Sequence, residues 1–362
     1  MHITELSVAD YRNYNHQTVR FGDKINFVVG RNAQGKTNLI EAVYLCSVGK
    51  SARTPRDKEL VNYEKQRARV KVSVKKSYGD DKVEIVLDKD RGKQITINGM
   101  PISRMGELMG VVSTVFFSPD EMRIVKEAPA DRRRFMDIAL CQMSKTYFYL
   151  LTRYNKILAQ RNRLLKSGHV TDDALDVWDI QLVDVGSKII KTRRGFVASL
   201  SEAAGSCHAY LTGGEETLVL SYEGIEGDTV EDVQTAFSKR LKSERDKDRL
   251  RGYTHSGAHK DDICFTIAGK DIRAFGSQGQ QRTASLALKL AEVELVGSRG
   301  EYPILLLDDV LSELDLTRQK RLMAKIKDHQ TIITCTHIDP QLLDGLTDYN
   351  RIFVENAIIS ME

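Results

Sequence analysis

Residues 30–37 read GRNAQGKT, directly after the apolar run INFVV (residues 25–29) and directly before a helical stretch that begins near Lys36. The motif fits the phosphate-loop pattern GxxxxGK[ST], and strand, loop and helix follow in the order that this pattern requires. Glycines let the backbone turn tightly enough for N–H groups and a helix N-terminus to face phosphate oxygens. We therefore expect Lys36 to neutralise phosphate charge and the Thr37 hydroxyl to ligate Mg²⁺.

A second apolar run ends in two acids, as ILLLDD at residues 304–309. A phosphate loop needs an acidic element that positions the metal and the attacking water. We expect Asp308 to hold Mg²⁺, directly or through water, and Asp309 to orient or deprotonate the nucleophilic water. The alternative is an acidic helix cap after a core strand, which the presence of GRNAQGKT disfavours.

A third segment, SQGQQ at residues 277–281, precedes a long amphipathic helix that leads toward ILLLDD. A Ser/Gly segment at a helix N-terminus can bind a γ-phosphate through its hydroxyl, its N–H groups and the helix dipole. In isolation, however, an ordinary N-capping serine explains SQGQQ better.

The chain has 362 residues, which leaves room for about two or three compact domains. Its 54 Lys+Arg against 50 Asp+Glu give a net charge of +4, so a nucleic-acid or membrane surface would have to be a local patch. The N-terminus has no apolar stretch of the signal-peptide kind, and the longest apolar runs fall short of the roughly 20 residues of a membrane span, so we expect a cytosolic, cytoplasmic protein without membrane contact. The five cysteines are odd in number and widely separated, without a CxxC pair, which favours reduced and mostly buried thiols.

The pattern of apolar residues divides the chain. The first 100 residues alternate short β-rich runs with turns, and after about residue 252 strands and helices alternate again. Between them, apolar residues recur every three or four positions in two runs separated by SGHVTDD, which predicts an antiparallel helical hairpin or two ordinary core helices. We expect an α/β domain formed by residues 1–117 and 252–362, with a helical lobe inserted at 118–251.

The ordered motifs resemble those of the ATP-binding-cassette ATPases. GRNAQGKT corresponds to Walker A, SQGQQ to the signature, ILLLDD to Walker B, SELD (residues 312–315) to the D-loop, and His337 to the switch histidine. The resemblance implies a mixed-sheet ATPase head in which ATP is sandwiched between the Walker A of one subunit and the signature of another. His337 by itself would more often be a structural or exposed histidine.

The sequence departs from that family at two places. The residue after Walker B is usually Glu, and here it is Asp309, one methylene shorter, which would place the water less well and slow turnover. A Q-loop glutamine is not evident, and Ser118, Asp120 or Glu121 could occupy its position.

Within that superfamily the chain resembles the RecF DNA-repair family. The matching segments are YRNY (residues 11–14), NAQGKTNLIEA (32–42), FSPDEMRIVKEAPADRRRFMD (117–137), GAHKDD (257–262), SQGQQRT and DDVLSELD. The resemblance implies an ATP-dependent homodimer that binds duplex DNA, notably near junctions of single and double strands, and that works with RecO and RecR to load RecA at gaps.

The resemblance also implies site residues. Asp309, Asp308, His337 and Lys36 would be catalytic, and Thr37 and Asp308 would bind the metal. Contacts to ATP would come from Gly30, Arg31, Asn32, Ala33, Gln34, Gly35, Lys36, Thr37 and Asn38, and in trans from Ser277, Gly279 and Gln280.

Residues 123–166 hold eleven Lys/Arg against three acids, a local net charge of +8. Such a run is a candidate patch for DNA phosphates. Alternatively its bases pair with the acids of the second helical run, Asp172, Asp173, Asp176, Asp179 and Asp184. Since no base-reading motif is visible, we expect contacts mainly to phosphates and little sequence preference.

The sequence therefore favours a DNA-binding ATPase switch in which slow hydrolysis, stimulated by DNA, acts as a timer. The nucleotide-binding subunit of a membrane transporter is the main alternative. A scaffold that uses ATP only to hold two copies together is a third.

Overall fold

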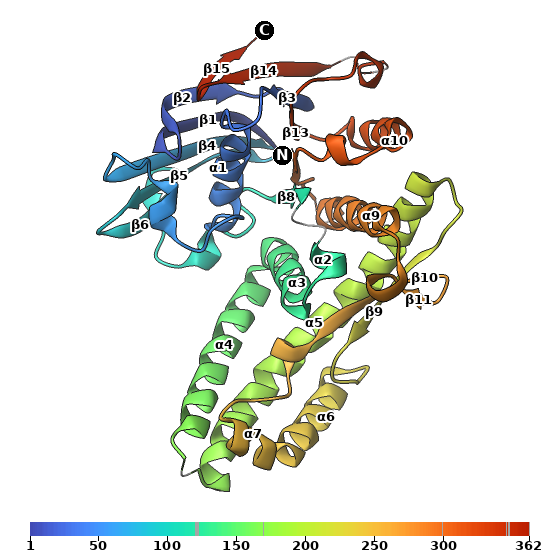
Figure 1. Ribbon diagram of the computed structural model, residues 1–362. Helices are drawn as coiled ribbons and strands as arrows, with labels where there is room; N and C mark the ends of the chain where they lie inside the picture. The colour runs from blue at the N-terminus through green and yellow to red at the C-terminus, as the bar shows by residue number, and fades with distance from the viewer. Residues whose placement is uncertain (120–122, 169, 299, 345, 347, 362) are drawn as a thin grey trace. The chain divides into compact units, whose positions relative to one another are not determined.

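The computed structural model describes residues 1–119, 123–168, 170–298, 300–344, 346 and 348–361. The chain forms two compact units, which the ribbon in Figure 1 helps to locate. Unit 1 comprises Met1–Met122, Cys207–Glu215 and Ser285–Glu362, and unit 2 comprises Arg123–Ser206 and Glu216–Ala284. This division differs from the expected boundaries at residues 118–122 and 207–215, which group with unit 1, and at residues 252–284, which group with unit 2. A strand of the last segment pairs with a strand of unit 2.

Unit 1 contains an antiparallel sheet of six strands in the order β2-β1-β4-β5-β6-β7. Its strands are β1 (His2–Tyr11), β2 (Tyr14–Arg20), β4 (Arg67–Lys76), β5 (Gly79–Asp88), β6 (Gly92–Ile97) and β7 (Met100–Pro101). In β4, every second side chain is buried, from Ala68 to Val74. Such alternation is typical of an antiparallel sheet with one face on the core.

The second sheet of unit 1 has the order β15-β14-β3-β13-β12-β8 and is parallel except for its edge strand β15. Its strands are β3 (Ile25–Val29), β8 (Thr114–Phe117), β12 (Ile304–Asp308), β13 (Thr331–Cys335), β14 (Tyr349–Glu355) and β15 (Ile358–Met361). All residues of β12 and β13 are buried, as expected for central strands of a parallel sheet covered on both faces. The C-terminal ends of β3, β12 and β13 therefore meet at one edge.

Helix α1 (Lys36–Val48) lies between the two sheets, since it contacts β4 and β5 of one and β8, β12 and β13 of the other (Figure 1). Its apolar residues surround the whole helix, which suits burial on all sides. Unit 1 also holds α10 (Leu316–Ile326) and the 3₁₀ turns η1 (Asp57–Leu60), η2 (Met105–Glu107), η5 (Leu311–Glu313) and η6 (Pro340–Leu342).

Unit 2 is mainly helical. It contains α2 (Arg123–Lys126), α3 (Pro129–Met143), α4 (Lys145–Lys166), α6 (Val230–Ser243), α7 (Arg245–Arg251), α8 (Ile272–Phe275) and η4 (Ala258–Lys260). A small antiparallel sheet has the order β11-β10-β9, with β9 (Leu218–Glu223), β10 (Asp262–Ile267) and β11 (Lys270–Asp271). Two helices, α5 (Asp172–Thr212) and α9 (Gln278–Gly297), have residues in both units.

The expected antiparallel helical arm is present as α4 and the N-terminal part of α5 (Figure 1). Residues near the start of α4 meet the middle of α5, and residues near the end of α4 meet the start of α5: Tyr147 bonds Arg193, whereas Arg161 bonds Asp179. The apolar run before the turn is nevertheless two helices, because Ser144 ends α3 and its hydroxyl caps α4 by accepting from the Tyr147 N–H. The α/β architecture with an inserted helical lobe is confirmed.

Candidate active site

The phosphate loop connects β3 to α1 at the edge where the parallel strands end. Ala33 (φ 64°) and Gly35 (φ 120°) adopt positive φ angles within it. A Cβ atom on Gly35 would lie 2.9 Å from the hydroxyl oxygen of Tyr14, and one on Gly30 would collide with the carbonyl oxygen of Val354. Both glycines are thus required by close approach of neighbouring atoms.

Lys36 lies inside the loop, with 7% of its surface exposed. Its ammonium donates to the carbonyl oxygens of Gly30 (2.7 Å) and Arg31 (2.9 Å). Helix α1 has no acidic residue in its first turn and no side-chain cap. The ammonium, the helix dipole and the N-terminal N–H groups therefore favour an anion at this place.

The Walker-type acid lies beside the loop. Asp308 is buried at the end of β12, and its Oδ1 accepts hydrogen bonds from the hydroxyls of Thr37 (3.0 Å) and Thr334 (2.7 Å). The Thr334 hydroxyl also accepts from the backbone N–H of Asp309 (2.9 Å). Asp309 has a φ of 54°, a conformation that aspartate adopts more readily than most residues. One strand end thus positions both acids.

Thr334 was not among the residues that the sequence singled out. What identifies Thr334 is the register of the parallel sheet, in which Thr334 of β13 pairs with Asp308 of β12. A hydroxyl at that position faces the acid only if the two strands are neighbours, which the sequence alone does not establish.

Burial raises the pKa of Asp308 above its ordinary value, while the bonds from Thr334 and Thr37 and the charge of Arg53 lower it. A carboxylate in such surroundings is stabilised by any cation that replaces lost solvation. Burial also raises the pKa of Cys335 to about 12. The Cys335 thiol therefore stays neutral and does not act as a nucleophile. The backbone carbonyl oxygen of Cys335 accepts a hydrogen bond from the Gly30 N–H of the loop (3.2 Å).

A network of polar side chains supports the outer side of the loop. Glu41 is buried in α1 and forms a bidentate pair with Arg12 (2.9 and 2.8 Å). Arg53 lies 3.7 Å from Glu41 and donates to Asn38 (2.9 Å), which donates to Asn13 (2.8 Å). Asn13 then donates to the carbonyl oxygen of Gln34 in the loop (3.3 Å). Arg12, Glu41 and Arg53 were missed as site residues, although YRNY and NLIEA stood out as motifs.

The signature segment lies in unit 2, at the start of α9. Ser277 and Gln280 form a reciprocal cap, in which the Ser277 N–H donates to Gln280 Oε1 (2.9 Å) and the Gln280 N–H donates to Ser277 Oγ (3.2 Å). Gln280 also donates to Glu216 (2.6 Å). Ser277 and Gly279 are exposed. Ser277 is thus an N-cap, as the simpler interpretation had it, and it is also accessible.

Two further candidates lie in unit 1. His337 follows the end of β13, is exposed, and has its Nδ1 3.2 Å from the Thr336 hydroxyl. Asp315 caps α10, accepting from the Arg318 N–H (2.9 Å), and that bond lowers the pKa of the Asp315 carboxyl. Of the Q-loop candidates, Ser118 is buried after β8, whereas Asp120 and Glu121 lie outside the described residues.

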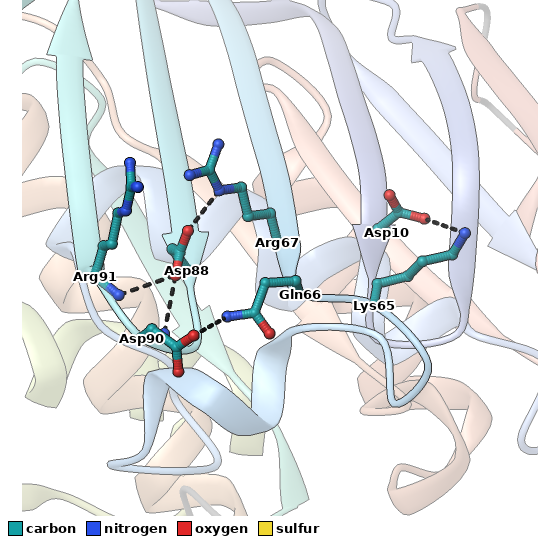
Figure 2. Close-up of a pocket in the computed structure, with 7 residues that line it drawn as sticks. All are labelled: Asp10, Lys65, Gln66, Arg67, Asp88, Asp90 and Arg91. Atoms are coloured by element: carbon teal, nitrogen blue, oxygen red, sulfur yellow. Dashed lines mark hydrogen bonds and ion pairs between the residues drawn. The ribbon is translucent and has the colours of Figure 1, made fainter.

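A recess at one end of the antiparallel sheet is lined by several charged side chains, some of which pair with one another (Figure 2). Arg67 pairs with Asp88 (2.5 Å), and Gln66 donates to Asp90 (2.8 Å). The backbone N–H groups of Arg91 and Asp90 also donate to the Asp88 carboxylate. Together with the contact to Arg67, these bonds hold the pKa of the Asp88 carboxyl well below its ordinary range. These contacts connect the ends of neighbouring strands, so we do not assign the recess as a binding site.

The donor set beside the phosphate loop fits Mg²⁺. Thr37 and Asp308 offer a hydroxyl and a carboxylate oxygen 3.0 Å apart. Mg²⁺ takes such hard oxygen ligands together with phosphate oxygens and water. Within the described residues, no cluster of three or more His, Cys, Asp and Glu side chains suits another metal.

This geometry is that of a P-loop ATPase: a buried strand, a glycine-bent loop with an internal lysine, and a neighbouring strand that ends in two acids. The family model "RecF/RecN/SMC N terminal domain" matches residues 2–360. The DNA replication and repair protein RecF of Alkaliphilus oremlandii (strain OhILAs) is 45% identical over 344 residues, 94% of either chain. That of Clostridium kluyveri (strain ATCC 8527 / DSM 555 / NBRC 12016 / NCIMB 10680 / K1) is 44% identical over 357 residues, 98% of either chain.

A solved structure of the recombination mediator protein RecF-ATP in the RecFOR pathway matches with a TM-score of 0.92 and 32% identity, covering 99% of this chain and 97% of that chain. The chain therefore belongs to the RecF family of DNA replication and repair proteins. Among the described helices, none has both the length and the apolar character needed to cross a bilayer.

Proposed function

We propose that this protein is an ATP-dependent switch that binds duplex DNA near gaps and strand junctions and helps RecO and RecR to load RecA. The observation that carries the ATPase part is the 3.0 Å bond between Thr37 and Asp308, which joins the phosphate loop to the acidic strand end. Family membership supports the DNA-repair part. The transporter alternative is left without support by that membership.

ATP binding follows from the loop. The triphosphate draws the Lys36 ammonium from the Gly30 and Arg31 carbonyl oxygens, to which it donates in the described residues without an ion pair to a carboxylate. Thr37 and Asp308 would hold Mg²⁺, and this ion would supply positive charge that neutralises the phosphates. Positive charge is thus concentrated where charge develops in the transition state.

Hydrolysis follows from the second acid. Asp309 orients a water and accepts its proton, and its left-handed backbone is held by the N–H bond to Thr334. His337, at the end of β13, is the γ-phosphate sensor. Because the aspartate side chain is one methylene shorter than that of glutamate, we expect slow ATP hydrolysis.

The composite site requires a second copy. Ser277, Gly279 and Gln280 form a helix N-terminus whose serine and glycine are exposed, and we assign them to the γ-phosphate held by a partner subunit. ATP then stabilises a two-fold dimer with two such sites, and hydrolysis releases it.

The experiment that tests this function is ATP turnover measured against protein concentration, with and without mixed-sequence duplex DNA. Turnover per subunit that rises with concentration supports a site shared between subunits, and stimulation by DNA supports the DNA switch. A rate independent of both would contradict the proposal. ATP-dependent dimerisation without phosphate release would identify a scaffold instead.

A further inference from the structure

The basic run of unit 2 contains buried and exposed members that the sequence could not distinguish. Arg132 is 1% exposed and pairs with Asp262, and Arg161 is fully buried and pairs with Asp179 and Asp248. These arginines belong to the interior and are unavailable to a ligand. The exposed bases of helix α4, in contrast, are Lys145, Arg153, Lys156, Arg163 and Lys166.

These five residues, here called the α4 basic face, lie on one side of the helix. Because an α-helix completes a turn in about 3.6 residues, Lys145, Lys156 and Arg163 project in nearly the same direction. By the same geometry, Arg153 and Lys166 flank them on either side. Helix α4 contains no Asp or Glu at all. Its exposed face is therefore of a single sign.

Four of the five α5 acids that might have neutralised this face are engaged elsewhere, Asp179 with buried Arg161 among them. Asp172 and Asp176 of α5 pair with Arg249 and Arg245 of α7, and Asp184 pairs with Lys188 of its own helix. Among the residues that the structure describes, none of the five bases has an ion pair with a carboxylate. The alternative that the run pairs with the acids of α5 thus holds for buried Arg161 and fails for the exposed bases.

We infer that the α4 basic face is the surface on which this protein holds the phosphate backbone of duplex DNA. The inference rests on the proposed function and names the place where it occurs. The distance along the helix from Lys145 to Arg163 is roughly 27 Å at 1.5 Å per residue, which matches about eight base pairs of duplex. Long, unpaired Lys and Arg side chains on a rigid helix contact phosphates without reading bases.

The test compares two double variants of the full-length protein that lose the same charge. Lys156→Gln/Arg163→Gln removes two bases from the face, and Lys239→Gln/Lys242→Gln removes two exposed bases from α6. Binding of a mixed-sequence 30-base-pair duplex is measured with ATP across a range of salt concentrations. For the α4 variant we expect the slope of log K against log salt to fall by about 1.8, and affinity at 0.1 M salt to drop roughly 60-fold.

The α6 variant should keep the slope of the unmodified protein, and both variants should keep its melting temperature and ATP affinity. Equal effects of the two variants would overturn the placement on α4, because net charge alone would then explain them. Unchanged DNA binding in the α4 variant would also overturn the placement on α4. If that variant then loses binding to an acidic protein partner, the face binds a protein and not DNA. Failure of the unmodified protein to bind duplex at any salt concentration would instead contradict the proposed function itself.

Discussion

The molecule presents two helix N-termini with phosphate-binding residue types, and they differ in what surrounds them. At α1, Lys36 is buried within the loop, Thr37 bonds Asp308, and no side chain caps the helix. At α9, Ser277 is exposed, and its hydroxyl already accepts a hydrogen bond from the Gln280 N–H. The first is organised by these contacts within the loop, whereas the second is exposed, and the carboxylate beside it, Glu216, accepts from the Gln280 amide (2.6 Å). The comparison supports the proposal that α1 binds ATP and that α9 completes a site that another copy has loaded.

Lys36→Ala breaks the organised side of this comparison and should have the largest effect. Losing charge-assisted hydrogen bonds worth roughly 3 kcal/mol weakens ATP binding about 100-fold. Titration calorimetry with ATP and Mg²⁺ measures the dissociation constant of ATP. The matched control is Lys50→Ala, an exposed lysine just after the same helix, which should bind ATP normally. Near-normal affinity of the Lys36 variant would show that the loop is not the nucleotide site.

Asp309→Asn separates binding from chemistry on the same side. The amide cannot accept a proton from water, and loss of a general base costs about 100-fold in turnover. Phosphate release under single-turnover conditions measures this, while ATP affinity and ATP-dependent dimerisation should persist. A variant with unchanged turnover would remove Asp309 from the mechanism and leave the water to another residue.

Ser277→Arg tests the exposed side. The bulk of the longer side chain fills the position of the partner's γ-phosphate, so that ATP should bind to the monomer while dimer affinity falls at least about tenfold. Analytical ultracentrifugation with ATP measures the dimer. Ser298→Arg, near the other end of α9 and also exposed, is the control that should still dimerise. Tight ATP-dependent dimers of the Ser277 variant would contradict the sandwich.

Much of this comparison could be predicted from the sequence because strand-loop-helix motifs are local. GRNAQGKT predicted the loop, and ILLLDD predicted the buried strand that ends beside it. Thr334 could not be found this way, since its role depends on which strand neighbours β12. The same holds for the arm: the basic run was visible, but the separation of buried Arg132 and Arg161 from the exposed bases depends on partners that are distant in the sequence, such as Asp262 and Asp248.

The smallest expected effect concerns Asp308 in the absence of nucleotide and metal. Because burial raises the pKa of its carboxyl in the folded state, ionisation favours the unfolded chain, and stability is lost as pH rises through the folded-state pKa. Asp308→Asn cannot ionise, yet its amide oxygen can still accept from Thr37 and Thr334. We expect the variant to melt a few degrees above the unmodified protein at pH 7, in calorimetry without Mg²⁺.

That difference should shrink as pH is lowered toward about 3.9, the ordinary pKa of aspartate, where both states of the unmodified protein gain the proton. Asp23→Asn, an exposed aspartate of unit 1, controls for the change in net charge. A lower melting temperature of the Asp308 variant at pH 7 would show that its carboxylate stabilises the empty site. A variant that is more stable but loses metal-dependent ATP binding would show that the buried carboxylate lowers the folding stability and is needed to hold Mg²⁺. The difference in melting temperature then reports the free-energy cost of keeping this acid beside the α1 loop.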